Sequence, residues 1–190
     1  GIDIKRLDKG AVIFNTEREE GFAVFVVDNT NRTEARYWID DFLRVRQRQD
    51  NYHNTHNTLA MCKKYVTKHL SKEFEVSKAD QAELLNETMK YFQEQESFSM
   101  DDFSEKVIRQ PEVVESFTRF RQEYEQDRDI RIEDEFGISD SAVKKQARSY
   151  KSVIKLDRNF HIYVHGNRNL LEQGEDEKGK FYKVYYEEEE

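Results

Sequence analysis

The chain has 190 residues and a mass of 22.9 kDa, enough for one domain with a hydrophobic core or for two small ones. Charged residues make up 37% and aromatic residues 13%, which favours a folded, heavily solvated protein over a disordered one. A single cysteine excludes a disulfide framework and a multi-thiolate zinc site. There is no glycine-rich phosphate loop and no apolar run long enough to span a membrane, so we expect neither a nucleotide site nor a membrane partner.

The N-terminal part is predicted to form β-structure. Two apolar segments, residues 11–14 and 22–27, are separated by polar residues and a glycine, which is typical of a β-hairpin. The second segment is apolar on both faces, so we expect it to be covered on both sides. Residues 35–39 fit either a third strand or the entry to a helix. Residue 1 is not Met and the strand pattern begins almost at once, so we expect upstream sequence to be lacking.

The middle of the chain is predicted to be helical. Apolar residues recur at helical spacing from Thr58 to Leu70. Further stretches with the same spacing follow four sequence patterns that are typical of a helix start. These start signals are a capping box at Ser77 and Asp80, a similar pair at Ser99 and Asp102, Pro111 at a first helical position, and Ser139 or Asp140 before a shorter helix to about Tyr150.

The C-terminal part returns to β-structure. Short strands are expected at residues 152–156, 160–165 and 181–186, the last reached through the polar, glycine-containing stretch 172–180. The predicted fold class is therefore α+β, with a β-hairpin at the N-terminal end, a helical middle and antiparallel β-strands at the C-terminal end.

This pattern predicts three regions. Residues 1–49 form a β-rich segment that continues a missing N-terminal region, residues 50–150 are helical, and residues 151–190 form a hairpin region packed on the helices. The aromatic strand at 181–186 is a candidate edge for a homodimer.

Two pairs of histidines are candidate metal ligands. His53 and His56 would lie one turn apart on a helix and could hold zinc with a third ligand, but no third ligand is evident, so we favour surface or capping roles. His161 and His165 share one side of a strand, where structural roles are favoured over a nuclease-like site. A metal-dependent nuclease is the weakest of the functional hypotheses, and we expect no metal and no cofactor.

The only cysteine is the remaining candidate for catalysis. Cys62 follows the apolar face of its helix beside Lys63 and Lys64, which could lower its pKa. Burial as a small apolar residue is favoured, because no orienting carboxylate or oxyanion-stabilising group accompanies it. We therefore predict that the chain is not an enzyme.

The net charge of −8 is unevenly distributed. Residues 36–72 carry about +5 and residues 136–160 about +4, whereas residues 73–135 carry about −11 and residues 172–190 about −5. Taken alone, this pattern favours ordinary solubility charge on helix faces, and the alternative is that mobile cations at such spacings contact phosphates. The cations that are candidates for such phosphate contacts are Arg44, Arg46, Arg48, Lys63, Lys64, Lys68, Lys144, Lys145, Arg148 and Lys151.

Two local patterns sharpen this expectation. Arg44, Arg46 and Arg48 alternate with other residues, so an extended backbone would project all three guanidinium groups from one side. Residues 136–145 resemble the turn and second helix of a helix-turn-helix, although the charged stretch before them offers little apolar surface to pack on.

Three segments carry a family resemblance: residues 1–10 (GIDIKRLDKG), 37–43 (YWIDDFL) and 151–166 (KSVIKLDRNFHIYVHG). They resemble the bacterial nucleoid-associated protein family of the 37-kDa type, most closely the versions of Bacteroides-like bacteria. The resemblance spans essentially the whole chain and corresponds to the C-terminal half of a family member. It implies a cytoplasmic protein that associates with the nucleoid and binds double-stranded DNA with little sequence preference, without catalytic residues.

Two functional hypotheses follow. In the first, the chain binds double-stranded DNA through phosphate contacts, with other nucleoid proteins and a second copy as candidate partners. In the second, it is a protein-interaction module whose acidic surface engages a basic or DNA-handling partner. Binding to a DNA duplex discriminates between them.

Overall fold

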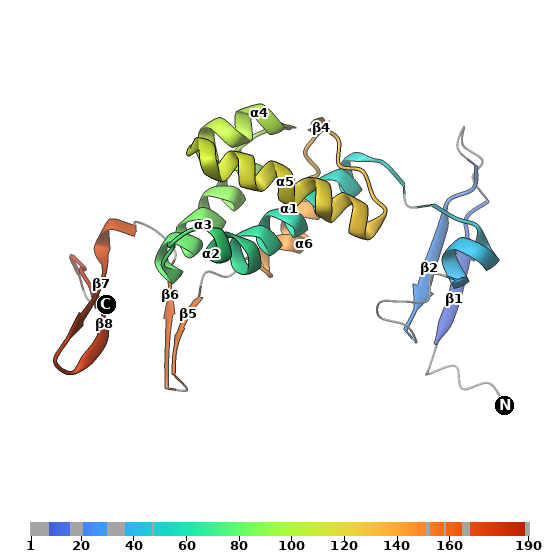
Figure 1. Cartoon of the computed structure of the whole chain (residues 1–190). Helices are drawn as coiled ribbons and strands as arrows, with labels where there is room; N and C mark the ends of the chain where they lie inside the picture. Colours follow the sequence, from blue (N-terminus) through green and yellow to red (C-terminus); the bar gives the residue numbers. More distant parts are fainter. Residues whose placement is uncertain are drawn as a thin grey trace. The chain divides into compact units, whose positions relative to one another are not determined.

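The computed structural model describes residues 8–15, 21–29, 37–46, 48–150, 153–157, 159–164 and 168–188. The chain divides into two compact units, residues 1–48 and 49–190, and each is described by itself. The predicted α+β class is confirmed, with a hairpin near the N-terminus, a helical middle and antiparallel hairpins near the C-terminus (Figure 1).

The first unit contains the expected hairpin. Strand β1 (Lys9–Ile13) pairs antiparallel with β2 (Val24–Asp28), and the register places Val12 opposite Phe25. A π-helical segment, η1 (Trp38–Leu43), follows, so this stretch is helical rather than a third strand. The rings of Trp38 and Phe42 stack with centroids 4.8 Å apart.

The expectation that residues 22–27 are covered on both faces is wrong for this unit. Phe25 is 60% exposed, and Phe22 and Val12 are more than half exposed as well. The physical reason is that the described residues of the unit supply only two strands and one short helical segment. They form no second layer over this face of the hairpin.

The second unit is built on helices, several of which begin where the sequence predicts. Its helical elements are α1 (Asn51–Lys64), η2 (Tyr65–His69), α2 (Leu70–Glu73), α3 (Lys78–Glu94), α4 (Met100–Phe103), η3 (Ser104–Ile108), α5 (Pro111–Arg128) and α6 (Asp140–Ala147). The capping box at Ser77 is confirmed, because Ser77 and Asp80 exchange side chain to backbone hydrogen bonds of 3.1 and 2.9 Å. Ser99 and Ser139 precede α4 and α6, but their side chains make no capping bond.

None of the helices in the described part of the chain combines the length and hydrophobicity needed to cross a bilayer. Their apolar faces instead enclose a core that is rich in aromatic rings. Strand β3 (Ser97–Ser99) pairs with β4 (Glu135–Gly137) and places Phe98 opposite Phe136. Phe98 is only 1% exposed, with ring centroids 4.8 Å from Phe136 and 5.3 Å from Phe92.

Strand β4 also rules out the helix-turn-helix that residues 136–145 suggested. The segment before α6 is a strand rather than a helix, and α5 already ends at Arg128. The chain between them is held by Arg121 of α5, which donates to the Ile132 carbonyl at 2.6 Å and pairs with Asp134 at 2.6 Å. These bonds direct the chain into β4 instead of into a further helix.

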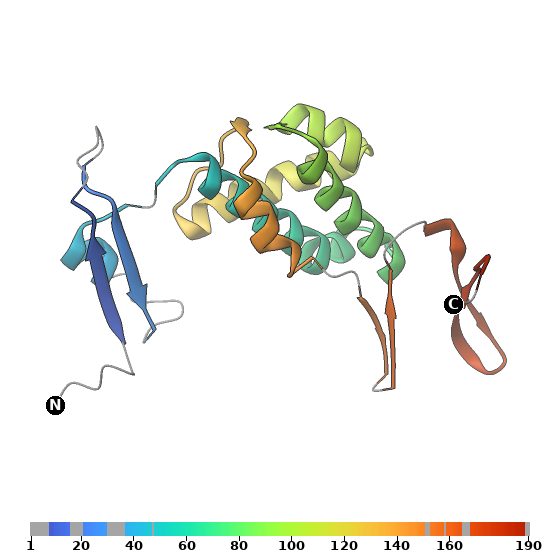
Figure 2. The ribbon, with the colours of Figure 1, turned by 180° about the vertical axis from the view of Figure 1, so that it is seen from behind.

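Two hairpins complete the second unit (Figure 2). Strand β5 (Val153–Leu156) pairs with β6 (Phe160–Tyr163), and β7 (Leu171–Asp176), preceded by the 3₁₀ turn η4 (Arg168–Leu170), pairs with β8 (Gly179–Val184). Both hairpins pack on α3, where Ile154 and Leu171 are buried with Ala79.

Strand β7 was not expected, because its residues are polar. It is stabilised by its partner strand: Lys183 donates to Glu172 at 3.1 Å, and the Phe181 ring lies so close over Gly174 that a side chain there would come within 2.5 Å of it. Such cross-strand contacts are invisible to periodicity within one strand.

The stacked position of Phe98 predicts a large effect on stability. Phe98→Ala should lower the free energy of unfolding by about 3–5 kcal/mol, because it removes a fully buried ring and leaves a cavity. Phe160→Ala, at an exposed ring, should change it by less than about 0.5 kcal/mol. Chemical denaturation of the two variants checks this, and equal effects would contradict the described core.

Candidate nucleic-acid interface

Helix α6 is held against α1 by its apolar side. Ala142 and Val143 are buried, and so is Tyr150 just after the helix. The Tyr150 hydroxyl donates to the Leu59 carbonyl of α1, and the Ser139 amide donates to the Thr55 hydroxyl at 3.0 Å. These contacts at both ends fix which side of α6 faces solvent.

Three of the predicted cations lie on that outward side. Lys144, Lys145 and Arg148 are exposed and fall on one arc of the helix, opposite Val143 and Tyr150. In the part of the chain that the structure describes, none of the three pairs with a carboxylate. By contrast, the cations Lys106, Arg109, Arg119, Arg121 and Arg131 lie 2.6–3.9 Å from carboxylate oxygens.

A polar cluster joins this cationic surface to α1. Lys145 donates to the Tyr52 hydroxyl at 3.2 Å, and Gln146 donates to Nδ1 of His56 at 2.9 Å. Burial lowers the pKa of His56, and the positive charges of Lys145 and His53 lower it further. Sequence reasoning did not link Tyr52 and His56 to α6, because about 90 residues separate the partners and no local motif marks them.

The N-terminal end of α6 has the opposite charge. A surface depression there is lined by Glu94, Glu96 and Asp140, together with Ser139 and Ser141. Carboxylates repel phosphate, so the cationic surface of the helix is confined to the turns after Ser141.

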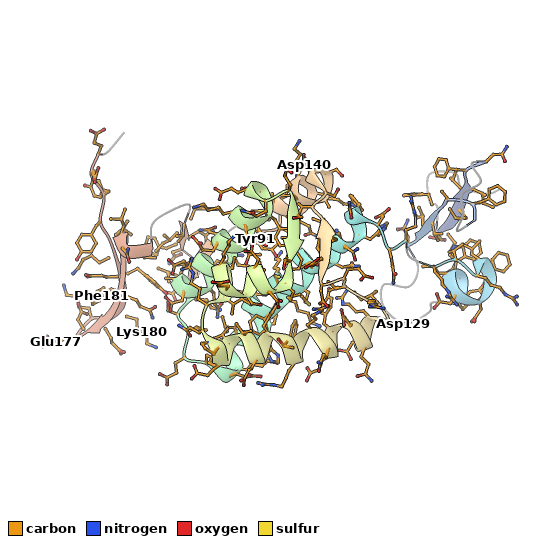
Figure 3. All side chains as sticks on the ribbon, turned by 90° about the horizontal axis from the view of Figure 1, so that it is seen from above. Tyr91, Asp129, Asp140, Glu177, Lys180 and Phe181 are labelled. Atoms are coloured by element: carbon orange, nitrogen blue, oxygen red, sulfur yellow. The ribbon has the colours of Figure 1, made fainter. Side chains whose placement is uncertain are left out.

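The predicted cations of α1 and η2 do not all join this surface. The Lys64 ammonium lies 5.3 Å from the ring centroid of Tyr124 and 5.8 Å from that of Phe120, both on α5. Figures 1 and 2 view the unit from opposite sides, with α5 nearer in the first and α6 nearer in the second. Figure 3 places Asp140, at the start of α6, and Asp129, just after α5, on opposite sides. The Lys64 ammonium therefore lies against the rings of α5.

The other predicted cations have varied surroundings. Lys63 is half-buried and Lys68 is exposed on η2. Arg44, Arg46 and Arg48 belong to the first unit, and Lys151 lies outside the described residues. Arg44 ends η1 in a left-handed conformation with φ 52°, so Arg44 itself does not adopt the extended conformation that the alternation suggested.

Residues 1–189 match the family model described as nucleoid-associated protein YejK. The chain belongs to this nucleoid-associated protein family. No curated protein and no solved structure matches the chain.

Three histidines of this nucleoid-associated family member, His53, His56 and His69, are engaged in hydrogen bonds with Asp50, Gln146 and Glu73. The ring Nδ1 of His53 lies 2.7 Å from the carboxylate of Asp50, the N-cap of α1, and the His53 backbone N–H donates to the same carboxylate at 3.0 Å. Among the described residues, no group of three or more metal-ligating side chains is present. His161 is exposed on β6, and His165 lies outside the described residues.

The idea that lysines activate Cys62 is wrong. Cys62 is buried in the core, and burial raises the pKa of its thiol, whereas nearby lysines would have lowered it. A neutral, enclosed thiol is a poor nucleophile.

The α1–α6 cluster predicts a measurable coupling. Lys145→Gln removes a positive charge beside His56, so the pKa of His56 should rise toward its usual value. Because this pKa is lowered in the folded state, the unfolded chain binds the proton first, and stability falls as the pH drops through the usual histidine range. Lys145→Gln should reduce that loss. NMR titration of His56 checks the shift, and an unchanged pKa would contradict the described contact.

Proposed function

We propose that this chain is a non-enzymatic, cytoplasmic protein of the nucleoid that binds double-stranded DNA with little sequence preference through phosphate contacts. The observation that carries the proposal is the outward side of α6, where Lys144, Lys145 and Arg148 are exposed without carboxylate partners in the described chain. Membership of the nucleoid-associated protein family supports it.

The chemistry of this surface favours phosphates over bases. Lysine and arginine side chains on a short exposed helix reach backbone oxygens without needing a fixed register, and such contacts carry no sequence information. Each neutralised phosphate releases counterions, so binding is expected to weaken steeply with salt. Arg44, Arg46, Arg48, Lys63, Lys64, Lys68 and Lys151 are proposed as further, weaker contributors.

The net negative charge of the chain is compatible with this proposal. Nearly half of the carboxylates, 19 of 39, belong to residues 73–135, which include α5 on the side of the unit opposite α6 (Figure 2). Exposed charges are screened beyond about 10 Å at 0.1 M salt. A polyanion on α6 is therefore affected mainly by the local charge rather than by the net charge.

Charge reversal on α6 tests the proposal. Lys144→Glu, Lys145→Glu and Arg148→Glu together should weaken duplex binding at least tenfold and equally for unrelated sequences. The slope of log affinity against log salt should become shallower by up to about three, one for each lost phosphate contact. Fluorescence anisotropy with labelled duplexes measures both quantities.

The matched control changes the net charge by the same amount elsewhere. Lys72→Glu, Arg119→Glu and Arg131→Glu reverse three exposed cations that lie outside α6. This variant should lose little affinity. Equal losses in both variants would mean that net charge, rather than the α6 surface, governs binding, and unchanged affinity in the α6 variant would overturn the assignment.

The second candidate function is an acidic surface for a basic partner. The observation that favours it is α5, where Glu112, Glu115, Glu123 and Asp127 are exposed and unpaired with cations of the described chain. The test compares duplex DNA with a basic polypeptide such as polylysine at low salt. If the chain binds polylysine but no duplex, and a variant with all four residues changed to lysine no longer binds polylysine, the acidic-surface function replaces DNA binding.

A further inference from the structure

The β5–β6 hairpin forms a ribbon with one end fixed on the helices. Its base is attached to α3, where Ile154 is buried with Ala79 and Asn86 donates to the Val164 carbonyl at 3.2 Å. The register continues to Leu156 opposite Phe160. In both Figure 1 and Figure 2 the two strands extend away from the helices.

The far end of this ribbon exposes an aromatic ring. Phe160 is 66% exposed, whereas the phenylalanines of the helical core are buried. An apolar ring held in water at the end of a projecting element is a common feature of contact sites, because contact with a partner removes the cost of hydrating it.

The charge of the ribbon indicates the chemistry of that partner. Lys155 lies opposite His161, and both are exposed on the face that points away from Ile154. Neither forms an ion pair within the described chain. In the sequence, residues 151–165 hold three lysines or arginines and one carboxylate, Asp157. The face that Lys155 and His161 share therefore complements an anionic partner rather than a cationic one.

We infer that the β5–β6 ribbon enters the minor groove of duplex DNA, with Lys155 and His161 near the phosphates and Phe160 at a base step. This inference rests on the proposed function and names a second DNA contact beside α6. Strands and strand ribbons are used in DNA grooves, and inserted apolar side chains partly unstack bases and kink the duplex. The minor groove presents a degenerate pattern, which agrees with weak sequence preference.

The ribbon and the α6 surface share one support. Helix α6 and strand β5 are successive elements, and both pack against α3. A duplex held by Lys144, Lys145 and Arg148 is therefore near the base of the ribbon, so one DNA molecule can engage both. The two contacts differ in kind, because α6 offers charge alone and the ribbon adds an apolar ring.

The first test uses the carboxylate at the turn of the ribbon. Asp157 has φ 51°, a left-handed conformation that asparagine adopts readily. Asp157→Asn removes a negative charge near the phosphates and should tighten duplex binding about two- to fivefold at low salt, less at high salt. Asp129→Asn is the matched control, because Asp129 has the same φ of 51° and is exposed at the end of α5.

The second test uses the exposed ring. Phe160→Ala in the whole chain should weaken duplex binding about tenfold and abolish bending of a duplex labelled at both ends for energy transfer. The salt slope should stay unchanged, because no phosphate contact is lost. Phe160→Leu keeps an apolar wedge and should restore most of the bending.

The outcomes separate this inference from the proposed function. Tighter binding by Asp157→Asn but not by Asp129→Asn, with loss of bending in Phe160→Ala, supports the ribbon. If the α6 variant loses binding while Asp157→Asn and Phe160→Ala bind and bend DNA as the unaltered chain does, the ribbon inference fails and the proposed function stands. If the unaltered chain binds no duplex, both fail.

Discussion

The burial of Tyr150 is the contact on which the proposed surface depends. Its ring lies in the core, and its hydroxyl, whose pKa burial raises, donates to the Leu59 carbonyl of α1. Tyr150 lies three residues after the end of α6, so together with the Ser139–Thr55 bond at the other end it fixes the rotation of the helix about its axis. Because Val143 and Tyr150 must face α1, Lys144, Lys145 and Arg148 must face away from it. The position of the cations is thus a consequence of apolar packing.

The same logic explains why an acidic chain can present a cationic surface. Residues 73–135 contain nearly half of the carboxylates, and the core requires α3 and α5 to turn their apolar faces inward and their charged faces outward. Many cations of this region are neutralised locally, as in the pairs Arg119–Glu73 and Arg121–Asp134. Helix α6 follows in sequence and has no such partners in the described chain. Segregation of charge along the sequence therefore becomes segregation of charge in space.

Much of the helical middle could be predicted from the sequence because its signals are local. The capping box at Ser77, the proline that begins α5 and the apolar spacing within each helix all act within a few residues. Strands β3 and β4 could not be predicted, because each has a single buried apolar residue and their pairing depends on Phe98 meeting Phe136. A contact between distant residues leaves no periodic trace.

In the candidate site, too, local spacing could be predicted from the sequence and contacts between distant residues could not. The grouping of Lys144, Lys145 and Arg148 follows from helical spacing alone, whereas their link to Tyr52 and His56 depends on how α6 packs on α1. Lys63 and Lys64 were grouped because they are adjacent in sequence, but neighbours on a helix point about 100° apart. That rotation directs Lys64 to the rings of α5. Charge counted along a sequence therefore predicts a surface only where the helix faces are also known.

The two parts of the second unit are stabilised differently, and this bears on what a ligand can do. The helices enclose a large aromatic core of their own, whereas an isolated two-stranded hairpin is marginally stable in water. The β5–β6 hairpin is stabilised by a few side chains, chiefly Ile154 with Leu156 and Ile162 beside it, packed at α3. A partner that contacts the far end of the hairpin adds a second point of attachment. Binding there would stabilise the hairpin itself, while binding at α6 would leave an already ordered helix unchanged.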